Sequence, residues 1–154
     1  MPRIFHIVES VNNFFEKITM SYDNTKPLLL FDGVCNLCNA IVQFVIEKNK
    51  KENIQFASLQ SETGQAILKK NGLATTDFDT IVLVENDTIY TQSTAALRLS
   101  RHFDGFYRCL YFFIIIPAPI RNLVYRFISK NRYRWFGKEE SCWLPTPDLQ
   151  KRFF

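Results

Sequence analysis

The stretch LLLFDGVCNLC, from Leu28 to Cys38, joins a buried strand to the start of a helix. Its first four residues are apolar without alternation, which is typical of a buried strand. The Asp-Gly pair that follows is a turn signal. Beyond the turn, apolar residues recur at helical spacing from Ala40 to Val45 and give way to the polar residues 48–53. This order of strand, turn and helix brings both cysteines of the stretch to the N-terminal end of a helix.

Residues 54–72 repeat the alternation of strand and helix. The run IQFASL, residues 54–59, alternates apolar and polar side chains as a strand does. Ser61 then begins a helical pattern, and Asn71-Gly72 is a C-terminal stop signal. Two strands joined through a helix predict a βαβ unit with parallel strands.

Residues 80–91 predict a β-hairpin. The run TIVLVE (80–85) is rich in β-branched residues, a turn pair Asn86-Asp87 follows, and the run TIYT (88–91) pairs back. Ser93 is the expected N-cap of a helix over residues 94–102. The predicted fold class is α/β, with a thioredoxin-like three-layer core that consists of a mixed four-stranded sheet with flanking helices.

Segments on both sides of this core are predicted to be helical. An amphipathic face recurs at spacings of four and three in Ile4, Val8, Val11, Phe15 and Ile18. The chain divides into an N-terminal helix and linker (1–24), the thioredoxin-like core (25–105) and a C-terminal helical extension (106–154). Large aromatic side chains lie among arginines in residues 125–145, so we expect the extension to pack on the core.

The composition is that of one globular domain. The chain has 154 residues, 47% of them hydrophobic and 22% charged, with a net charge of +4. Residues 121–138 hold six basic side chains and no acidic one. Such a block is either a solvated helix face, the interpretation we favour, or a site for anions, nucleic acid or a membrane surface. The N-terminal 20 residues lack the apolar core of a signal peptide, which predicts a reducing, cytoplasmic compartment.

The spacing of Cys35 and Cys38 is that of a redox pair. A thiolate attacks a disulfide, and a helix N-terminus stabilises negative charge through its unpaired N–H groups. We therefore expect Cys35 to be the more exposed sulfur and the attacking thiolate. Cys38 lies one turn later on the same face, where it can resolve the mixed disulfide.

The run DGVCNLC resembles the motif of the DCC family of predicted thiol–disulfide oxidoreductases, with Asp32, Cys35 and Cys38 on the residues that name the family. The resemblance continues in FASLQSETGQ (56–65), YTQSTAAL (90–97) and NRYRWFGKEESCWLPT (131–146). It implies an enzyme of the protein-disulfide reductase type, with Cys35, Cys38 and Asp32 as catalytic residues. The expected partners are a disulfide-containing protein or small molecule and an external thiol or reductase that supplies electrons. Neither cofactor nor metal is expected.

Asp32 has two interpretations that stay open. As a carboxylate next to Cys38 it can move a proton during exchange, although it also disfavours a second negative charge nearby. Alternatively, it serves the Asp-Gly turn that starts the helix. Thioredoxins usually carry a cis-proline in front of the third strand. Residues 77–80 contain no proline, so we expect the substrate groove to be built differently.

Two alternatives to an oxidoreductase remain. One is a zinc-binding module in which Cys142 and a histidine complete the ligand set of the CxxC pair, although Cys142 is more simply a packing residue. The other is a protein that binds nucleic acid or anionic lipid through the basic, aromatic residues 125–136. Of these we expect at most a weak contact with a membrane surface, and no nucleic acid. Cys109 lies in an apolar run and is predicted to be in the core.

Overall fold

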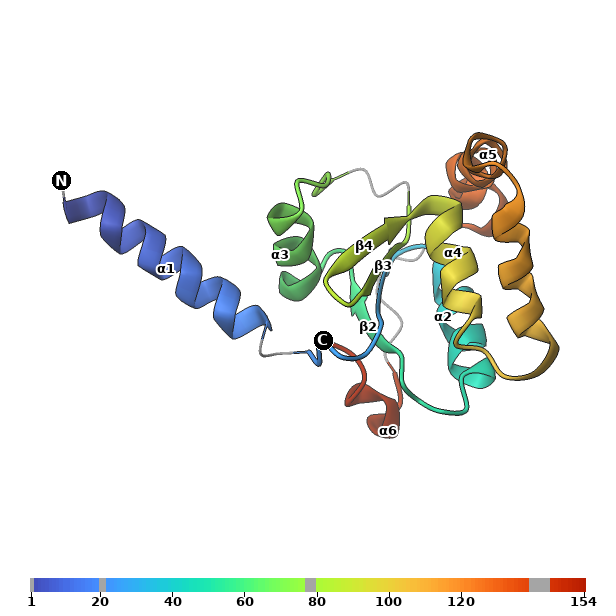
Figure 1. The fold of residues 1–154 in the computed structure, drawn as a ribbon, viewed down its shortest axis with the longest axis horizontal. Helices are drawn as coiled ribbons and strands as arrows, with labels where there is room; N and C mark the ends of the chain where they lie inside the picture. Colours follow the sequence, from blue (N-terminus) through green and yellow to red (C-terminus); the bar gives the residue numbers. More distant parts are fainter. Residues whose placement is uncertain (1, 20–21, 77–79, 139–144) are drawn as a thin grey trace.

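A mixed four-stranded sheet forms the centre of the protein (Figure 1). The computed structural model describes residues 2–19, 22–76, 80–138 and 145–154. The strands are β1 (Leu28–Phe31), β2 (Gln55–Ser58), β3 (Val82–Glu85) and β4 (Thr88–Thr91), in the order β2-β1-β3-β4. β1 runs parallel to β2 and antiparallel to β3, which pairs antiparallel with β4.

The helices are α1 (Pro2–Thr19), α2 (Asn36–Lys48), α3 (Glu62–Lys70), α4 (Gln92–Ser100), the 3-10 helix η1 (Gly105–Ile115), α5 (Ala118–Phe136) and α6 (Pro147–Gln150). α2 and α4 cover one face of the sheet, and α3 covers the other. Leu29 and Phe31 point to the side of α2 and α4, whereas Leu28 and Leu30 point to the side of α3. The central strand is therefore buried on both faces, as its unbroken apolar run predicts. These three layers confirm the predicted α/β, thioredoxin-like class.

Local turn and cap signals are mostly confirmed. Asn86 and Asp87 have φ values of 49° and 61°, the left-handed backbone that a tight two-residue hairpin turn requires. Ser61 is the N-cap of α3, and its hydroxyl accepts a hydrogen bond from the Gly64 amide at 3.1 Å. The prediction for Ser93 is wrong. α4 begins earlier, after Thr91, and the buried Ser93 hydroxyl donates to a side chain of α5 instead.

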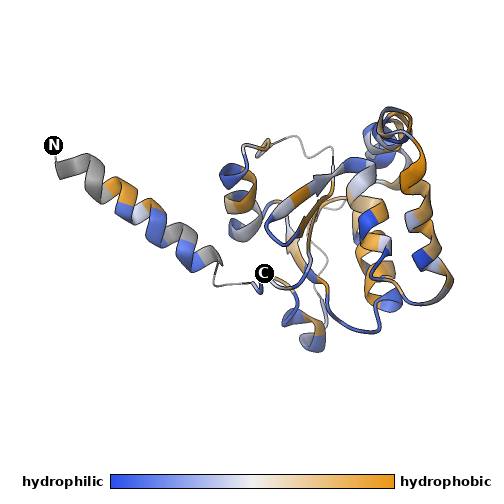
Figure 2. Cartoon of the chain, viewed as in Figure 1, coloured by the Kyte–Doolittle hydropathy of each residue, from blue (hydrophilic) through white to orange (hydrophobic). Residues whose placement is uncertain are grey.

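The two ends of the chain behave differently. α1 leads away from the α/β body (Figures 1 and 2). Its side chains Ile7, Val8 and Val11 are exposed. At the other end, the Arg152 carbonyl accepts from the Phe56 amide at 2.7 Å, and the Phe154 amide donates to the Phe56 carbonyl at 2.9 Å. The C-terminus thereby covers the outer edge of β2, which protects unpaired backbone groups. No helix in the described ranges is long and apolar enough to cross a membrane.

Gly64 is a test of how closely α3 approaches the sheet. A Cβ atom at this position would lie 2.2 Å from the Ser58 carbonyl oxygen. We expect Gly64→Ala to lower the free energy of unfolding by about 1–3 kcal/mol, because the backbone must move apart. Urea denaturation measures this change. Lys69→Ala, on the exposed side of the same helix, is the control and should change stability little. Equal stability of the two variants would contradict the close approach.

Candidate functional site

Cys35 is the N-cap residue of α2. Its backbone is extended, with φ −90° and ψ 119°, and its Sγ accepts a hydrogen bond from the Cys38 amide at 3.4 Å. The turn that follows β1 delivers this residue, since the Cys35 amide donates to the Asp32 carbonyl. Both cysteines are free thiols. The predicted position of the pair at a helix N-terminus is confirmed, and the first-turn N–H groups lie where they stabilise a charge on Cys35.

The expected order of exposure is wrong. Cys35 is 0% exposed and Cys38 is 7% exposed. Lys138 forms an isolated antiparallel bridge with Cys35, and the Asn36 side chain donates to the Phe136 carbonyl at 3.0 Å. The end of α5 therefore packs against the helix start that sequence reasoning left open to solvent. Cys38 instead borders a cavity between α2, α4 and α5.

The surroundings of Cys38 favour the neutral thiol. Burial raises the pKa of this thiol well above its usual range, and the neighbouring Cys35 and Asp32 act in the same direction. The Arg132 guanidinium opposes them. The two sulfurs thus lie in different environments, with Cys35 at a helix end and Cys38 in an apolar wall.

Asp32 is almost fully buried, at 2% exposed. One carboxylate oxygen accepts from the Val34 amide at 3.1 Å and from Gln60 Nε2 at 2.7 Å. The other forms an ion pair with Arg132 at 3.3 Å and accepts a hydrogen bond from the Tyr133 hydroxyl. The bond to Val34 is the local turn contact of the second interpretation of Asp32. Asp32 also lies near Cys38, as the first interpretation requires. Its role in proton transfer stays a prediction.

Sequence reasoning missed Arg132 and Tyr133. Arg132 is one of six basic residues in its block, yet it is only 5% exposed and is paired with a carboxylate a hundred positions away. Burial and the nearby Asp32 raise the pKa of Tyr133 to about 12, so this phenol stays protonated as a donor at neutral pH. The signal available was the block NRYRWFG, in which the family resemblance marks both residues without indicating their partner.

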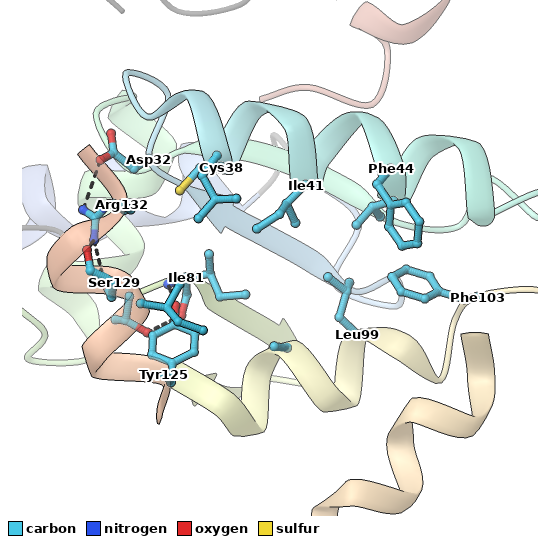
Figure 3. A pocket seen from close by; sticks show the side chains of 15 residues that line it. Asp32, Cys38, Ile41, Phe44, Ile81, Leu99, Phe103, Tyr125, Ser129 and Arg132 are labelled. Carbon is cyan, nitrogen blue, oxygen red and sulfur yellow. Dashed lines mark hydrogen bonds and ion pairs between the residues drawn. The ribbon is translucent and has the colours of Figure 1, made fainter. Parts of the chain in front are cut away.

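The cavity next to Cys38 has a volume of about 350 Å³ (Figure 3). Asp32, Cys38 and Arg132 lie at one end of it, and Phe44 and Phe103 lie at the other. The two aromatic rings meet edge to face, with centroids 5.7 Å apart. The sequence lacks the proline that usually faces the CxxC pair of thioredoxins. Here, helix α5 forms one wall of the cavity beside Cys38.

Within the extension, the described residues 125–138 contact the core. The Tyr125 hydroxyl accepts from the Ile81 amide at 2.9 Å, and Arg132 reaches Asp32. The expectation that its aromatic residues are covered fails for Trp135 and Phe136, which are about half exposed. Both residues lie at the C-terminal end of α5, after the buried Arg132.

Cys109 is exposed on η1, so its predicted core position is wrong, because η1 lies on the outside of α4. Cys142 lies outside the described residues. Among those described, no group of His, Cys, Asp or Glu side chains could hold a metal ion. The zinc alternative, which needs Cys142, stays untested.

Comparison with known proteins adds an independent finding. Residues 29–138 match the family model of the DCC1-like thiol-disulfide oxidoreductases. The chain is 54% identical to the uncharacterized protein YuxK of Bacillus subtilis (strain 168), over 82% of this chain and 92% of that protein. It is 39% identical to the DCC family protein At1g52590, chloroplastic, of Arabidopsis thaliana, over 89% of this chain and 77% of that protein. No solved structure matches significantly.

The buried pair of Asp32 and Arg132 predicts a double-mutant cycle. Arg132→Gln should lower the free energy of unfolding by about 3–5 kcal/mol, because the Asp32 carboxylate loses its buried partner. The double variant Asp32→Asn, Arg132→Gln should lose less than the sum of the two single variants. Denaturant unfolding measures all four proteins. Lys130→Gln, exposed on the same helix, is the control. Strict additivity would show that the pair does not couple.

Proposed function

Because the chain belongs to the family of DCC1-like thiol-disulfide oxidoreductases, we propose that it exchanges thiols and disulfides through Cys35 and Cys38. The observation that carries the proposal is the hydrogen bond from the Cys38 amide to Cys35 Sγ at the start of α2. Unpaired backbone N–H groups and the helix dipole face a sulfur in this position, and its partner lies one turn away. The chemistry uses no flavin, nicotinamide or metal.

The two sulfurs have different roles in the proposed exchange. The enzyme disulfide is opened when a substrate thiolate reaches the cavity side and attacks Cys38 Sγ. Cys35 then leaves as a thiolate at the N-terminus of α2. In the reducing direction the same steps run backward, so that Cys35 attacks Cys38 Sγ and releases the substrate thiolate. These roles reverse those expected from sequence, and the exposure of the two residues supports the reversal.

Asp32 belongs to the proposed site as a positioning residue. Its carboxylate joins the turn before Cys35 to Arg132, and its charge acts on the Cys38 thiol. It thereby sets both the geometry and the field at the pair. The substrate is a protein or small-molecule disulfide, and an external thiol or reductase of a reducing, cytoplasmic compartment restores the dithiol.

Cysteine variants test this function. We expect Cys35→Ser and Cys38→Ser each to lower the rate of disulfide reduction at least about a hundredfold, because exchange needs both sulfurs. Cys109→Ser, which changes an exposed cysteine, should retain full activity. Reduction of bis(2-hydroxyethyl) disulfide, coupled to an external thiol, is a suitable assay. Full activity of Cys35→Ser would refute the enzymatic proposal.

Trapping distinguishes the two sulfurs. We expect Cys35→Ser to accumulate a mixed disulfide on Cys38, since Cys38 borders the cavity and no second thiol resolves the adduct. Intact-protein mass spectrometry with peptide mapping locates the adduct. An adduct that accumulates on Cys35 of the Cys38→Ser variant instead would restore the roles expected from sequence.

A second candidate function is contact with an anionic lipid surface. Residues 105–138 contain seven basic residues and no acidic one. Over the same stretch, η1 and α5 expose many large apolar side chains. Figure 2 shows the hydrophobic residues along these helices. The most exposed include Phe106, Phe112, Ile115, Ile120, Leu123 and Phe127, which we call the η1–α5 surface. Apolar side chains among cations favour the boundary of an anionic bilayer.

Vesicle binding tests the lipid candidate. We expect the protein to cosediment with phosphatidylcholine vesicles that contain phosphatidylglycerol and much less with phosphatidylcholine alone. Phe112→Ser with Leu123→Ser should lower the bound fraction at least about threefold, because these exposed side chains then enter the bilayer poorly. Lys69→Ser, on the opposite side of the sheet, is the control. Absence of binding, or a dimer that only the double variant abolishes, would contradict the lipid surface.

A further inference from the structure

We propose that the cavity beside Cys38 binds the substrate, and that this substrate is a small, uncharged disulfide with apolar arms. The inference rests on the proposed exchange at Cys35 and Cys38 and names its substrate class. Three properties of the site carry it: the access to the sulfurs, the size and apolar lining of the cavity, and the ion pair of Asp32 with Arg132 at its end.

Access to the sulfurs favours a small molecule. Cys35 is fully buried. Cys38 is 7% exposed and lines the wall of the cavity. To reduce a disulfide on the surface of a folded protein, the attacking cysteine of the enzyme must itself be exposed. The volume of about 350 Å³ lies within the range of sites for small ligands.

The chemistry of the wall favours an apolar molecule. Ile41, Phe44, Ile81, Leu99 and Phe103 line most of the cavity (Figure 3). Ile41 and Phe44 belong to α2, and Leu99 belongs to α4. Ile81 directly precedes β3, and Phe103 follows α4. A ligand held here gains affinity by removing its own apolar surface from water.

The polar end of the cavity offers no unbalanced charge. Asp32 and Arg132 neutralise one another, and Arg132 also donates to the Ser129 hydroxyl at 2.6 Å. The Thr80 hydroxyl accepts from the Gln92 amide and donates to the Ile81 carbonyl. A charged disulfide would lose its hydration without gaining a counter-charge, which is costly. This argues against glutathione disulfide, which carries several charges.

A second apolar groove extends the site outward. It has a volume of about 340 Å³ and shares Ala96, Tyr125 and Ile128 with the cavity. Its remaining wall includes Phe113, Ile120 and Val124 of η1 and α5. Ala96 therefore lies between the Cys38 cavity and the outer surface, where an apolar arm of the substrate can continue.

The proposed reaction balances within the dithiol and the substrate. The Cys38 thiol attacks one sulfur of R–S–S–R and passes its proton to the departing sulfur, which forms a Cys38–S–S–R bond and releases one R–SH. The Cys35 thiolate then attacks Cys38 Sγ, which forms the Cys35–Cys38 disulfide and releases the second R–S⁻. The two protons of the original dithiol end on the two released sulfurs. The substrate gains two electrons, and the enzyme loses two.

The experiment compares diphenyl disulfide with glutathione disulfide in the full-length chain. We expect kcat/KM for diphenyl disulfide to exceed that for glutathione disulfide at least tenfold. Ala96→Phe, which fills the junction between cavity and groove, should lower kcat/KM for diphenyl disulfide at least tenfold and that for glutathione disulfide less than threefold. Ala74→Phe is the matched control, because Ala74 is exposed and does not line the cavity. Circular dichroism checks folding, and Ala96→Leu replaces Ala96→Phe if the larger side chain is not accommodated.

Two results overturn the inference: equal kcat/KM for the two disulfides in the wild type, or an equal loss for both disulfides in a folded Ala96 variant. Bibenzyl, in which a CH₂–CH₂ unit replaces the S–S bond, separates this failure from that of the proposed function. We expect saturable bibenzyl binding by Cys35→Ser with Cys38→Ser, and its loss when Ala96→Phe is added. Bibenzyl binding without turnover of either disulfide would overturn the exchange reaction and retain the apolar ligand. Turnover without bibenzyl binding would overturn the cavity assignment alone.

Discussion

The ion pair between Asp32 and Arg132 is the interaction on which the arrangement of the site depends. It joins the turn after the central strand to the last turns of α5, a hundred positions later in the chain. Two buried ions are stable together only when each satisfies the other, so the pair holds these two segments in register. With α5 held there, a cavity closes between α2, α4 and α5, and the chain after α5 crosses the start of α2.

This arrangement gives two neighbouring thiols opposite surroundings. Cys35 caps α2, where backbone N–H groups stabilise negative charge, but the end of α5 covers it. Cys38 borders the cavity, and burial keeps it a neutral thiol. The helix N-terminus faces Cys35, whereas the cavity gives access to Cys38. In the proposed exchange, the sulfur at the helix end and the sulfur that meets substrate are therefore different residues.

The C-terminal segment consequently does more than extend a thioredoxin-like core. Tyr125 and Arg132 contribute to the wall of the cavity, while the opposite side of η1 and α5 exposes apolar and basic side chains. One pair of helices thus shapes the surroundings of the redox pair and presents the η1–α5 surface outward. The groove that shares Ala96 with the cavity lies between these two features.

Most of the helices and strands, and the place of Cys35 and Cys38 in them, follow from local sequence patterns. These patterns are the spacing of apolar residues, the turn pair Asn86-Asp87 and the spacing of the CxxC motif. Each extends over only a few residues, so it can be recognised without knowing the fold. Which of the six cations in residues 121–138 is buried against Asp32 depends on the packing of distant segments, and in the fold it is Arg132. The same packing determines three further properties of the cysteines. Cys35 is covered, Cys38 borders a cavity and Cys109 is exposed. These properties depend on which distant segments meet, and no local pattern encodes a contact across a hundred residues.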